Sequence, residues 1–85
     1  MKTSNVMAIL IDKRTNSAPK VQEILTTYGS IIETRLGIHE TDDSQEEGLI
    51  LLVLRDDKEE ISNLADELKE VTGVKVNTME LKFHE

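Results

Sequence analysis

The stretch "LILLVLR" at residues 49–55 is apolar without interruption until its final arginine. It is too short for an amphipathic helix, and its aliphatic residues are typical of a strand that is apolar on both faces. A second run, "NVMAILIDK" at residues 5–13, has the same character. Strands of this kind need cover on both sides, so both runs belong in the middle of a sheet.

Two further segments alternate in polarity, as strands with one buried side do. In "SIIETRLGIH" (30–39), we expect three residues to face the core, namely Ile32, Leu36 and Ile38. The opposite face of this strand would then carry Glu33, Arg35, Gly37 and His39. The segment "VKVNTMELKF" (74–83) is the second alternating strand.

The segment 14–29 has apolar residues at helical spacing. Thr15, Asn16 and Ser17 are candidate N-caps, Pro19 fits only a first helical turn, and Gly29 is the expected stop. The apolar stripe of this helix consists of Val21, Ile24, Leu25 and Tyr28.

The segment 56–73 has the clearest helical pattern in the chain. Asp57, followed three residues later by Glu60, resembles a capping box, and Gly73 closes the segment. Its apolar stripe consists of Ile61, Leu64, Ala65, Leu68 and Val71.

The order of elements is therefore strand, helix, strand, strand, helix, strand. It predicts the α+β class and a ferredoxin-like βαββαβ sandwich, with a four-stranded antiparallel sheet and two helices on one face. Right-handed crossovers place the first and third strands in the centre of that sheet. These are the two strands that are apolar on both sides, so the topology and the apolar pattern agree.

Two helices can cover only one face of such a sheet. On the first strand, the other face would expose either Met7, Ile9 and Ile11 or Val6, Ala8 and Leu10. On the third, it would expose either Leu49, Leu51 and Val53 or Ile50, Leu52 and Leu54. A contiguous apolar patch usually marks an interaction surface, so we predict burial by a second protomer. The alternative is that these are scattered surface aliphatics, which are common.

A chain of 85 residues makes one domain, here residues 1–85. The only aromatic residues are Tyr28 and Phe83, so the core must be aliphatic. Because a core this small leaves little stability to spare, self-association as a dimer or tetramer is expected.

The formal net charge is −7, with 17 acidic residues against 10 lysines and arginines. This balance argues against direct nucleic-acid binding, which depends on clustered cations. Cysteine is absent, which fits a reducing compartment. The first apolar run is too brief for a signal peptide or a membrane span. We therefore expect a cytoplasmic protein that does not associate with membranes.

Two groups of residues are candidates for a ligand or interface contact. Arg35, Gly37 and His39 share one face of the second strand, and Asn16 and Ser17 lie where helix-start N–H groups could hold an anion. Arg35 could form two parallel hydrogen bonds with a carboxylate or could be a solvated edge charge. Gly37 could admit a ligand or mark a bulge, and we favour the bulge. For Asn16 and Ser17, plain helix capping is the favoured role.

The sequence predicts neither a metal site nor a cofactor. His39 and His84 are the only imidazoles, and a metal site normally needs three or four ligands. The acidic residues at 40–47 lack the spacing of a calcium loop, so a solvated hairpin loop is expected there. A metal held jointly by His39, nearby carboxylates and a second chain is the alternative.

Catalytic motifs are also missing from the sequence. There is no nucleophile elbow, phosphate-binding glycine loop, HExxH motif or cysteine pair. Acylphosphatases share the predicted topology, but their glycine-rich, arginine-bearing loop has no match in "DKRTNSAP", although Arg14 lies nearby. We therefore predict that the protein is not an enzyme, with an acylphosphatase-like activity as the less favoured alternative.

Two segments, "RLGIHE" and "GLILLVLRDDKEEISNLADELKEVTGVKVNTMEL", resemble a small family of iron-only hydrogenase system regulators. The fold of that family is similar to ACT domains and to the C-terminal domain of nickel-responsive repressors. The resemblance covers about residues 5–82, and its most distinctive parts are Arg35-x-Gly37 and Gly73-Val74-x-Val76. It implies a regulatory or ligand-sensing oligomer that acts through an effector or a protein partner.

Two departures limit what the resemblance implies. ACT domains that bind amino acids usually carry a glycine in the loop after the first strand, where this chain has Asn16-Ser17-Ala18-Pro19. Nickel-responsive repressors use histidines and a cysteine, and this chain has no cysteine. Amino-acid binding and nickel sensing are therefore both disfavoured. The remaining hypotheses are an ACT-like regulatory homo-oligomer and a metal or small-molecule sensor with a site between subunits.

Overall fold

The computed structural model describes residues 3–38 and 47–84. The elements are β1 (Thr3–Asp12), α1 (Ala18–Thr27), β2 (Ile32–Ile38), β3 (Glu47–Leu54), α2 (Lys58–Lys69) and β4 (Val74–Lys82). Short 3₁₀ turns at Lys13–Thr15 and Gly29–Ile31 flank α1. The predicted order of strands and helices is therefore confirmed, and the element boundaries differ from the expected ones by only a few residues.

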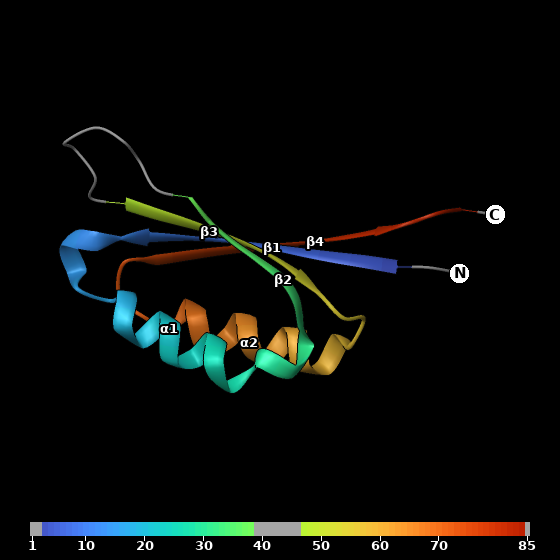
Figure 1. Cartoon of the computed structure of the whole chain (residues 1–85), viewed down its shortest axis with the longest axis horizontal. Coiled ribbons are helices and arrows are strands. Elements are labelled where there is room, and N and C mark those ends of the chain that lie inside the picture. The colour runs from blue at the N-terminus through green and yellow to red at the C-terminus, as the bar shows by residue number, and fades with distance from the viewer. Residues whose placement is uncertain (1–2, 39–46, 85) are drawn as a thin grey trace.

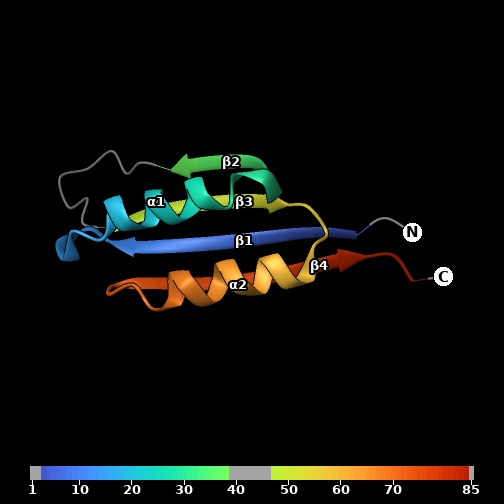
Figure 2. The same cartoon turned by 90° about the horizontal axis from the view of Figure 1, so that it is seen from below.

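The strands form one antiparallel sheet in the order β2-β3-β1-β4. Both helices lie on the same face of this sheet, α1 along β3 and α2 along β4 (Figures 1 and 2). β1 and β3 occupy the centre, as their two apolar faces predicted. The ferredoxin-like sandwich is confirmed.

The core lies between the sheet and the helices. The inward-facing residues of the two central strands are Met7, Ile9 and Ile11 of β1 and Ile50, Leu52 and Leu54 of β3. They meet the apolar stripes of the helices, whose buried members are Val21, Ile24, Leu25, Ile61, Leu64, Ala65 and Leu68. The sequence left open which face of each central strand would point away from the helices. In the structure, the outward face of β1 carries Val6, Ala8 and Leu10.

The expected facing of β2 was wrong. Ile32 pairs with Leu54, but the next pair is Thr34 with Val53, so a β-bulge at Glu33 shifts the register. One extra residue in a strand of period 2 moves every later side chain to the opposite face. Leu36 and Ile38 therefore point away from the helices and are 53% and 40% exposed.

The same bulge turns Arg35 to the helical side of the sheet, opposite to the expected side. Arg35 pairs with Leu52, and Gly37 pairs with Ile50. The side chains of Leu52 and Ile50 both face the core. Gly37 itself lies in regular pairing, so the expectation that it marks a bulge was also wrong. The bulge is at Glu33, four residues earlier in the chain.

The start of α1 is tied to the turn between α2 and β4. The Ser17 hydroxyl donates to the Thr72 carbonyl at 2.5 Å, and the Asp12 amide donates to the Gly73 carbonyl at 2.8 Å. Gly73 has a φ of 77°, a conformation that favours glycine. A Cβ added there would lie 2.5 Å from Thr15 Cγ2, so the two turns pack without room for a side chain at residue 73.

The start of α2 is capped as predicted. Asp57 is the N-cap, and its side chain accepts a hydrogen bond from the Glu60 amide at 3.1 Å. Glu59 and Glu60 in the first turn and Lys69 in the last turn also suit the helix dipole. Local signals therefore fix the ends of this helix independently of its packing.

Tyr28 closes α1 and joins the two helices. Its side chain is buried, and its hydroxyl donates to a carboxylate oxygen of Glu67 on α2. That hydrogen bond, together with burial and the negative charge of Glu67, raises the pKa of Tyr28 to about 12. The protonated phenol is the stabilised form, so this contribution is present below the ordinary pKa of 10.0 and is lost as the pH rises through about 12.

We expect the phenol to titrate with a midpoint at about pH 12 in the folded protein. Tyr28 is the only tyrosine and there is no tryptophan, so near-ultraviolet absorbance of tyrosinate reports this residue alone. Far-ultraviolet circular dichroism at each pH shows that the chain is still folded. In Glu67→Gln the acceptor loses its charge, and the midpoint should move back toward the ordinary value. A midpoint near 10 in the folded wild-type protein would contradict the contact.

Candidate functional site: the outer sheet face and the pocket between α1 and β2

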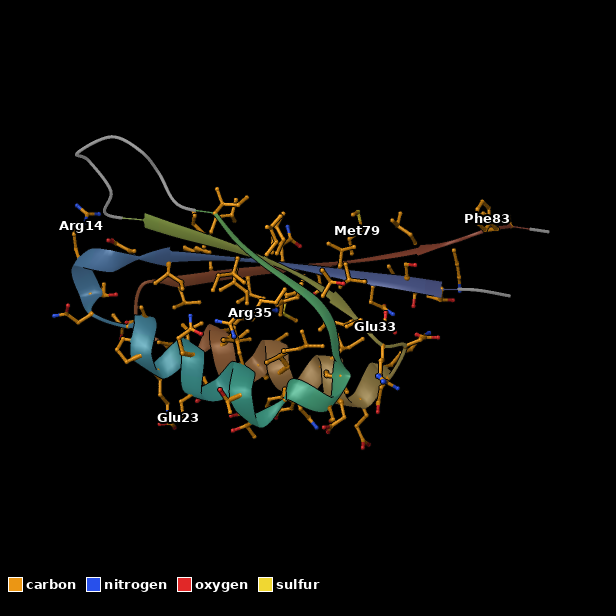
Figure 3. All side chains as sticks on the ribbon, viewed as in Figure 1. Arg14, Glu23, Glu33, Arg35, Met79 and Phe83 are labelled. Carbon is orange, nitrogen blue, oxygen red and sulfur yellow. The ribbon has the colours of Figure 1, made fainter. Side chains whose placement is uncertain are left out.

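The face of the sheet away from the helices, called here the outer face, is largely apolar. The register places side chains from all four strands on it. Its apolar members are Val6, Ala8, Leu10, Leu36, Ile38, Leu49, Leu51, Val53, Met79 and Leu81. Figure 3 shows Met79 and Phe83 on this side, opposite to the helical layer.

No part of the described chain covers the outer face. Met79 and Leu81 are 51% and 52% exposed, and Phe83, just beyond β4, is 78% exposed. A contiguous apolar surface of this extent is rare on a monomer and marks an interaction site. The outer face is therefore the largest candidate site of the molecule, and it is the surface that the sequence predicted would need a partner.

A pocket of about 340 Å³ lies at the other side of the sheet, beside the edge strand β2. Ala18 and Gln22 of α1 and Arg35 and Gly37 of β2 lie around it, and it is also lined by Ile11, Ile38, Gly48, Leu49 and Ile50. Arg35 extends from β2 toward α1 (Figure 3), where its guanidinium donates to the Gln22 side-chain oxygen. Among the described residues that line it, the pocket thus combines an apolar lining with one cation, Arg35.

Gly37 contributes open space to this pocket. A Cβ added at Gly37 would meet no atom within 4 Å, so the glycine is not forced by a close approach of another segment. Gln22, which holds the Arg35 side chain, was not among the residues singled out from the sequence. Nothing in its local sequence marks it, because the contact depends on the bulge that turns Arg35 toward α1.

Asn16 and Ser17 lie before α1 but do not line this pocket. Asn16 is exposed and has a φ of 58°, which asparagine tolerates better than most residues. Ser17 is the N-cap residue, but its buried hydroxyl bonds to Thr72 rather than to the helix N–H groups. Ser17 thus joins two turns and is not placed to bind a ligand with its side chain.

Arg14 forms an ion pair with Asp12 beside this turn. The Arg14 guanidinium donates to both carboxylate oxygens of Asp12 at 2.9 Å, and this contact holds the pKa of Asp12 below its usual value. The pair is largely exposed, so it contributes little to stability. Arg14 points to its own strand end rather than into the α1–β2 pocket.

His39 and most of the acidic loop at 40–47 lie outside the described residues. His84 is described and exposed. Within residues 3–38 and 47–84, no group of three or more histidine, aspartate or glutamate side chains could hold a metal ion. In the same part of the chain, neither helix has the length and apolar character needed to cross a membrane.

Several solved structures share this fold. The uncharacterized protein TM1266 from Thermotoga maritima aligns with a TM-score of 0.82 and 27% identity, covering 95% of this chain and 100% of that one. The ACT domain of the GTP pyrophosphokinase from Chlorobium tepidum aligns with a TM-score of 0.68 and 14% identity, covering 89% and 96% of the two chains.

A PII-like nitrogen regulatory protein, CPII from Thiomonas intermedia K12, aligns with a TM-score of 0.60 and 10% identity. The match covers 99% of this chain and 98% of that one, and the CPII structure contains ADP, AMP and bicarbonate. At these low identities, the ACT and CPII structures establish the ACT-like fold alone.

No curated protein sequence matches the chain. A family model does match it over residues 4–78, and the description of that family is "TM1266-like: Iron-only hydrogenase system regulator, putative". The match spans most of the chain and includes the two most distinctive parts of the resemblance, Arg35-x-Gly37 and Gly73-Val74-x-Val76. The chain therefore belongs to the TM1266-like family of iron-only hydrogenase system regulators.

Proposed function

We propose that the protein is a non-enzymatic regulatory domain that works as a homo-oligomer joined through the outer face. Membership of the regulator family and the ACT-like fold support the regulatory role. The observation that carries the oligomer is the apolar outer face, on which Leu36, Met79 and Leu81 are each at least half exposed. Exposed apolar side chains of this number favour burial against a partner.

We expect sedimentation velocity at micromolar concentration to show a dimer of twice 9.6 kDa, or a tetramer. Each chain carries a net charge of −7, so two chains repel each other when salt does not screen them. Raising the salt concentration from about 10 mM to about 150 mM shortens the screening length from roughly 30 Å to 8 Å and should tighten association. A single species of 9.6 kDa at all concentrations would refute the oligomer.

We further propose that regulation is exerted on a protein partner. Both helices of the described chain pack on the sheet, and neither is free to enter a DNA groove. The negative charge also disfavours binding to nucleic-acid phosphates. The family description points to components of an iron-only hydrogenase system as the regulated target.

The α1–β2 pocket supports a second function, the sensing of a small anion. Arg35 is the cation of that pocket, and its planar guanidinium suits a carboxylate or bicarbonate through two parallel hydrogen bonds. A ligand could displace Gln22 from Arg35, since that contact is exposed and its acceptor is an uncharged amide oxygen. The cation of this site comes from the same chain as α1, because the bulge turns Arg35 toward α1.

A thermal-shift screen of amino acids, adenine nucleotides, bicarbonate and divalent metals tests this second function. A ligand at a hundred times its dissociation constant should stabilise the folded state by roughly 2.7 kcal/mol. Arg35→Lys keeps the charge but cannot form the two parallel hydrogen bonds. The affinity for the ligand should therefore fall at least about tenfold.

Arg55→Lys is the matched control for Arg35→Lys, because Arg55 is exposed and lies next to β3, away from the pocket. It should leave the ligand response unchanged. If Arg35→Lys also leaves the response unchanged, the pocket is not the binding site. A screen without any response would leave the protein as an interaction domain.

A further inference from the structure

We propose that the partner on the outer face is a second copy of this chain, and that the two sheets cross diagonally instead of lying along each other. The inference rests on the proposed self-association and adds its geometry. It comes from the way in which apolar and polar side chains are distributed over the outer face. The register of the sheet gives that distribution row by row.

Each row of the outer face crosses the sheet from β2 to β4. One row runs Ile38, Leu49, Leu10, Lys75, and the next runs Leu36, Leu51, Ala8, Asn77. The third runs Thr34, Val53, Val6, Met79, and the fourth has Ser4 beside Leu81. The apolar residues thus lie on β2, β3 and β1 in the first two rows, on β3, β1 and β4 in the third, and on β4 in the fourth.

The apolar surface is therefore a diagonal band, and the two remaining corners are polar. The band begins at Ile38 and Leu36 on β2 and ends at Leu81 on β4, with Lys75 and Asn77 in one polar corner and Thr34 in the other. From its middle at Leu49 on β3 in the first row to Leu81 on β4, it crosses two strand spacings, about 10 Å, while advancing six residues, about 20 Å, so it makes an angle of roughly 25° with the strands.

In a symmetric dimer, the band of one chain lies over the band of the other when the two-fold axis lies in the plane between the two sheets. The axis then runs either along the band or perpendicular to it. Either axis crosses the strands of the two sheets at twice the band angle, roughly 50°, which is steeper than the roughly 30° of aligned sheet packing. A closely aligned packing would instead cover the whole face. It would bury Lys75 or Asn77 against apolar side chains, at the cost of desolvating them.

The twist of the sheet favours the crossed arrangement. Figure 1 shows that β2 at its Ile38 end and β4 at its Lys82 end both rise away from the helices. These are the two corners that hold the ends of the band. When two twisted sheets cross steeply, their rising corners approach each other and the other two corners diverge. Lys75, Asn77 and Thr34 would then remain in contact with water.

The uncharged apolar band is complementary to a second copy of itself, although the whole chain is acidic. The band contains no charged residue, so two chains of net charge −7 can meet there without placing acidic groups opposite each other. Symmetric pairs that use one patch on both subunits are also the commonest form of soluble oligomer. The band therefore fits its own copy, with Val6, Ala8, Leu51 and Val53 near the axis.

Matched lysine variants within one row test the arrangement. Leu51 lies in the centre of the band and Asn77 lies in a polar corner of the same row. Each substitution adds one positive charge and so reduces the repulsion between two acidic chains. We expect Leu51→Lys to raise the dimer dissociation constant at least about thirtyfold, and Asn77→Lys to change it less than about threefold.

Leu36→Lys provides a second band variant with little risk to folding, because Leu36 is 53% exposed in the single chain. It should weaken the dimer like Leu51→Lys, while circular dichroism shows folded monomers in each case. If Asn77→Lys weakens the dimer equally, the crossed arrangement is wrong and an aligned one remains. If no variant weakens it, the oligomer does not use the outer face, and a wild-type monomer would refute self-association itself.

Discussion

Gly73→Ala should destabilise the protein by about 2–4 kcal/mol, because it combines two unfavourable effects. The φ of Gly73 is 77°, a conformation that costs an alanine roughly 1–2 kcal/mol. The new Cβ would also lie 2.5 Å from Thr15 Cγ2 and 2.6 Å from Thr15 Oγ1. The turn before α1 and the turn between α2 and β4 would have to separate. That movement would weaken the hydrogen bonds from Asp12 and Ser17 to residues 72 and 73.

Gly29→Ala is the matched control for this substitution. Gly29 has no positive φ, and a Cβ there would meet no atom within 4 Å. The alanine should therefore be neutral or stabilise by up to about 1 kcal/mol, by restricting the unfolded chain. Urea unfolding at one fixed protein concentration measures both variants. Equal stabilities of Gly73→Ala and Gly29→Ala would show that the packing of Thr15 on Gly73 is not as described.

Leu52→Ala should cost about 2–5 kcal/mol, whereas Leu51→Ala should cost less than about 1 kcal/mol in the monomer. Leu52 is completely buried between the sheet and the helices, so its truncation leaves a cavity. Leu51 is the preceding residue of β3 but lies partly exposed on the outer face. A domain of this size has only roughly 4–13 kcal/mol of stability, so Leu52→Ala removes a large share of it.

The measurement is urea unfolding at a concentration low enough to keep the protein monomeric, because dimer formation would add to the apparent stability. At higher protein concentration, Leu51→Ala should lower the free energy of unfolding by more than it does in the monomer. The reason is that the partner would then bury the Leu51 side chain of the wild-type protein. Similar costs for the two substitutions in the monomer would contradict the assignment of faces in β3. The pair thus separates the core side of the sheet from its outer face.

The sequence predicted the architecture because the decisive patterns were local. The two strands with apolar residues on both faces, the capping residue Asp57 and the glycine at 73 each depend on a few neighbouring positions. The predictions of two central strands and of an open apolar face followed from them. Which face of β1 is open could not be predicted, because both faces carry aliphatic residues of similar size.

The candidate site was predicted less well, for a physical reason located at one residue. Period-2 alternation placed Leu36 and Ile38 in the core because the segment 32–38 was treated as a regular strand. The bulge at Glu33 depends on the pairing of Ile32 and Thr34 with β3, which is a long-range contact. Arg35 was therefore singled out as a candidate but assigned to the wrong side, and its partner Gln22 could not be identified.

The bulge at Glu33 also matters for comparing relatives of this protein. Alternate residues of β2 face opposite sides of the sheet, so one residue more or less before Thr34 decides which of them face the helices. A relative that lacks the extra residue and has the same residues after it would present its counterparts of Arg35 and Gly37 on the outer face of the sheet. Residue identity in this strand therefore transfers between family members only when the count of residues from Ile32 is conserved as well.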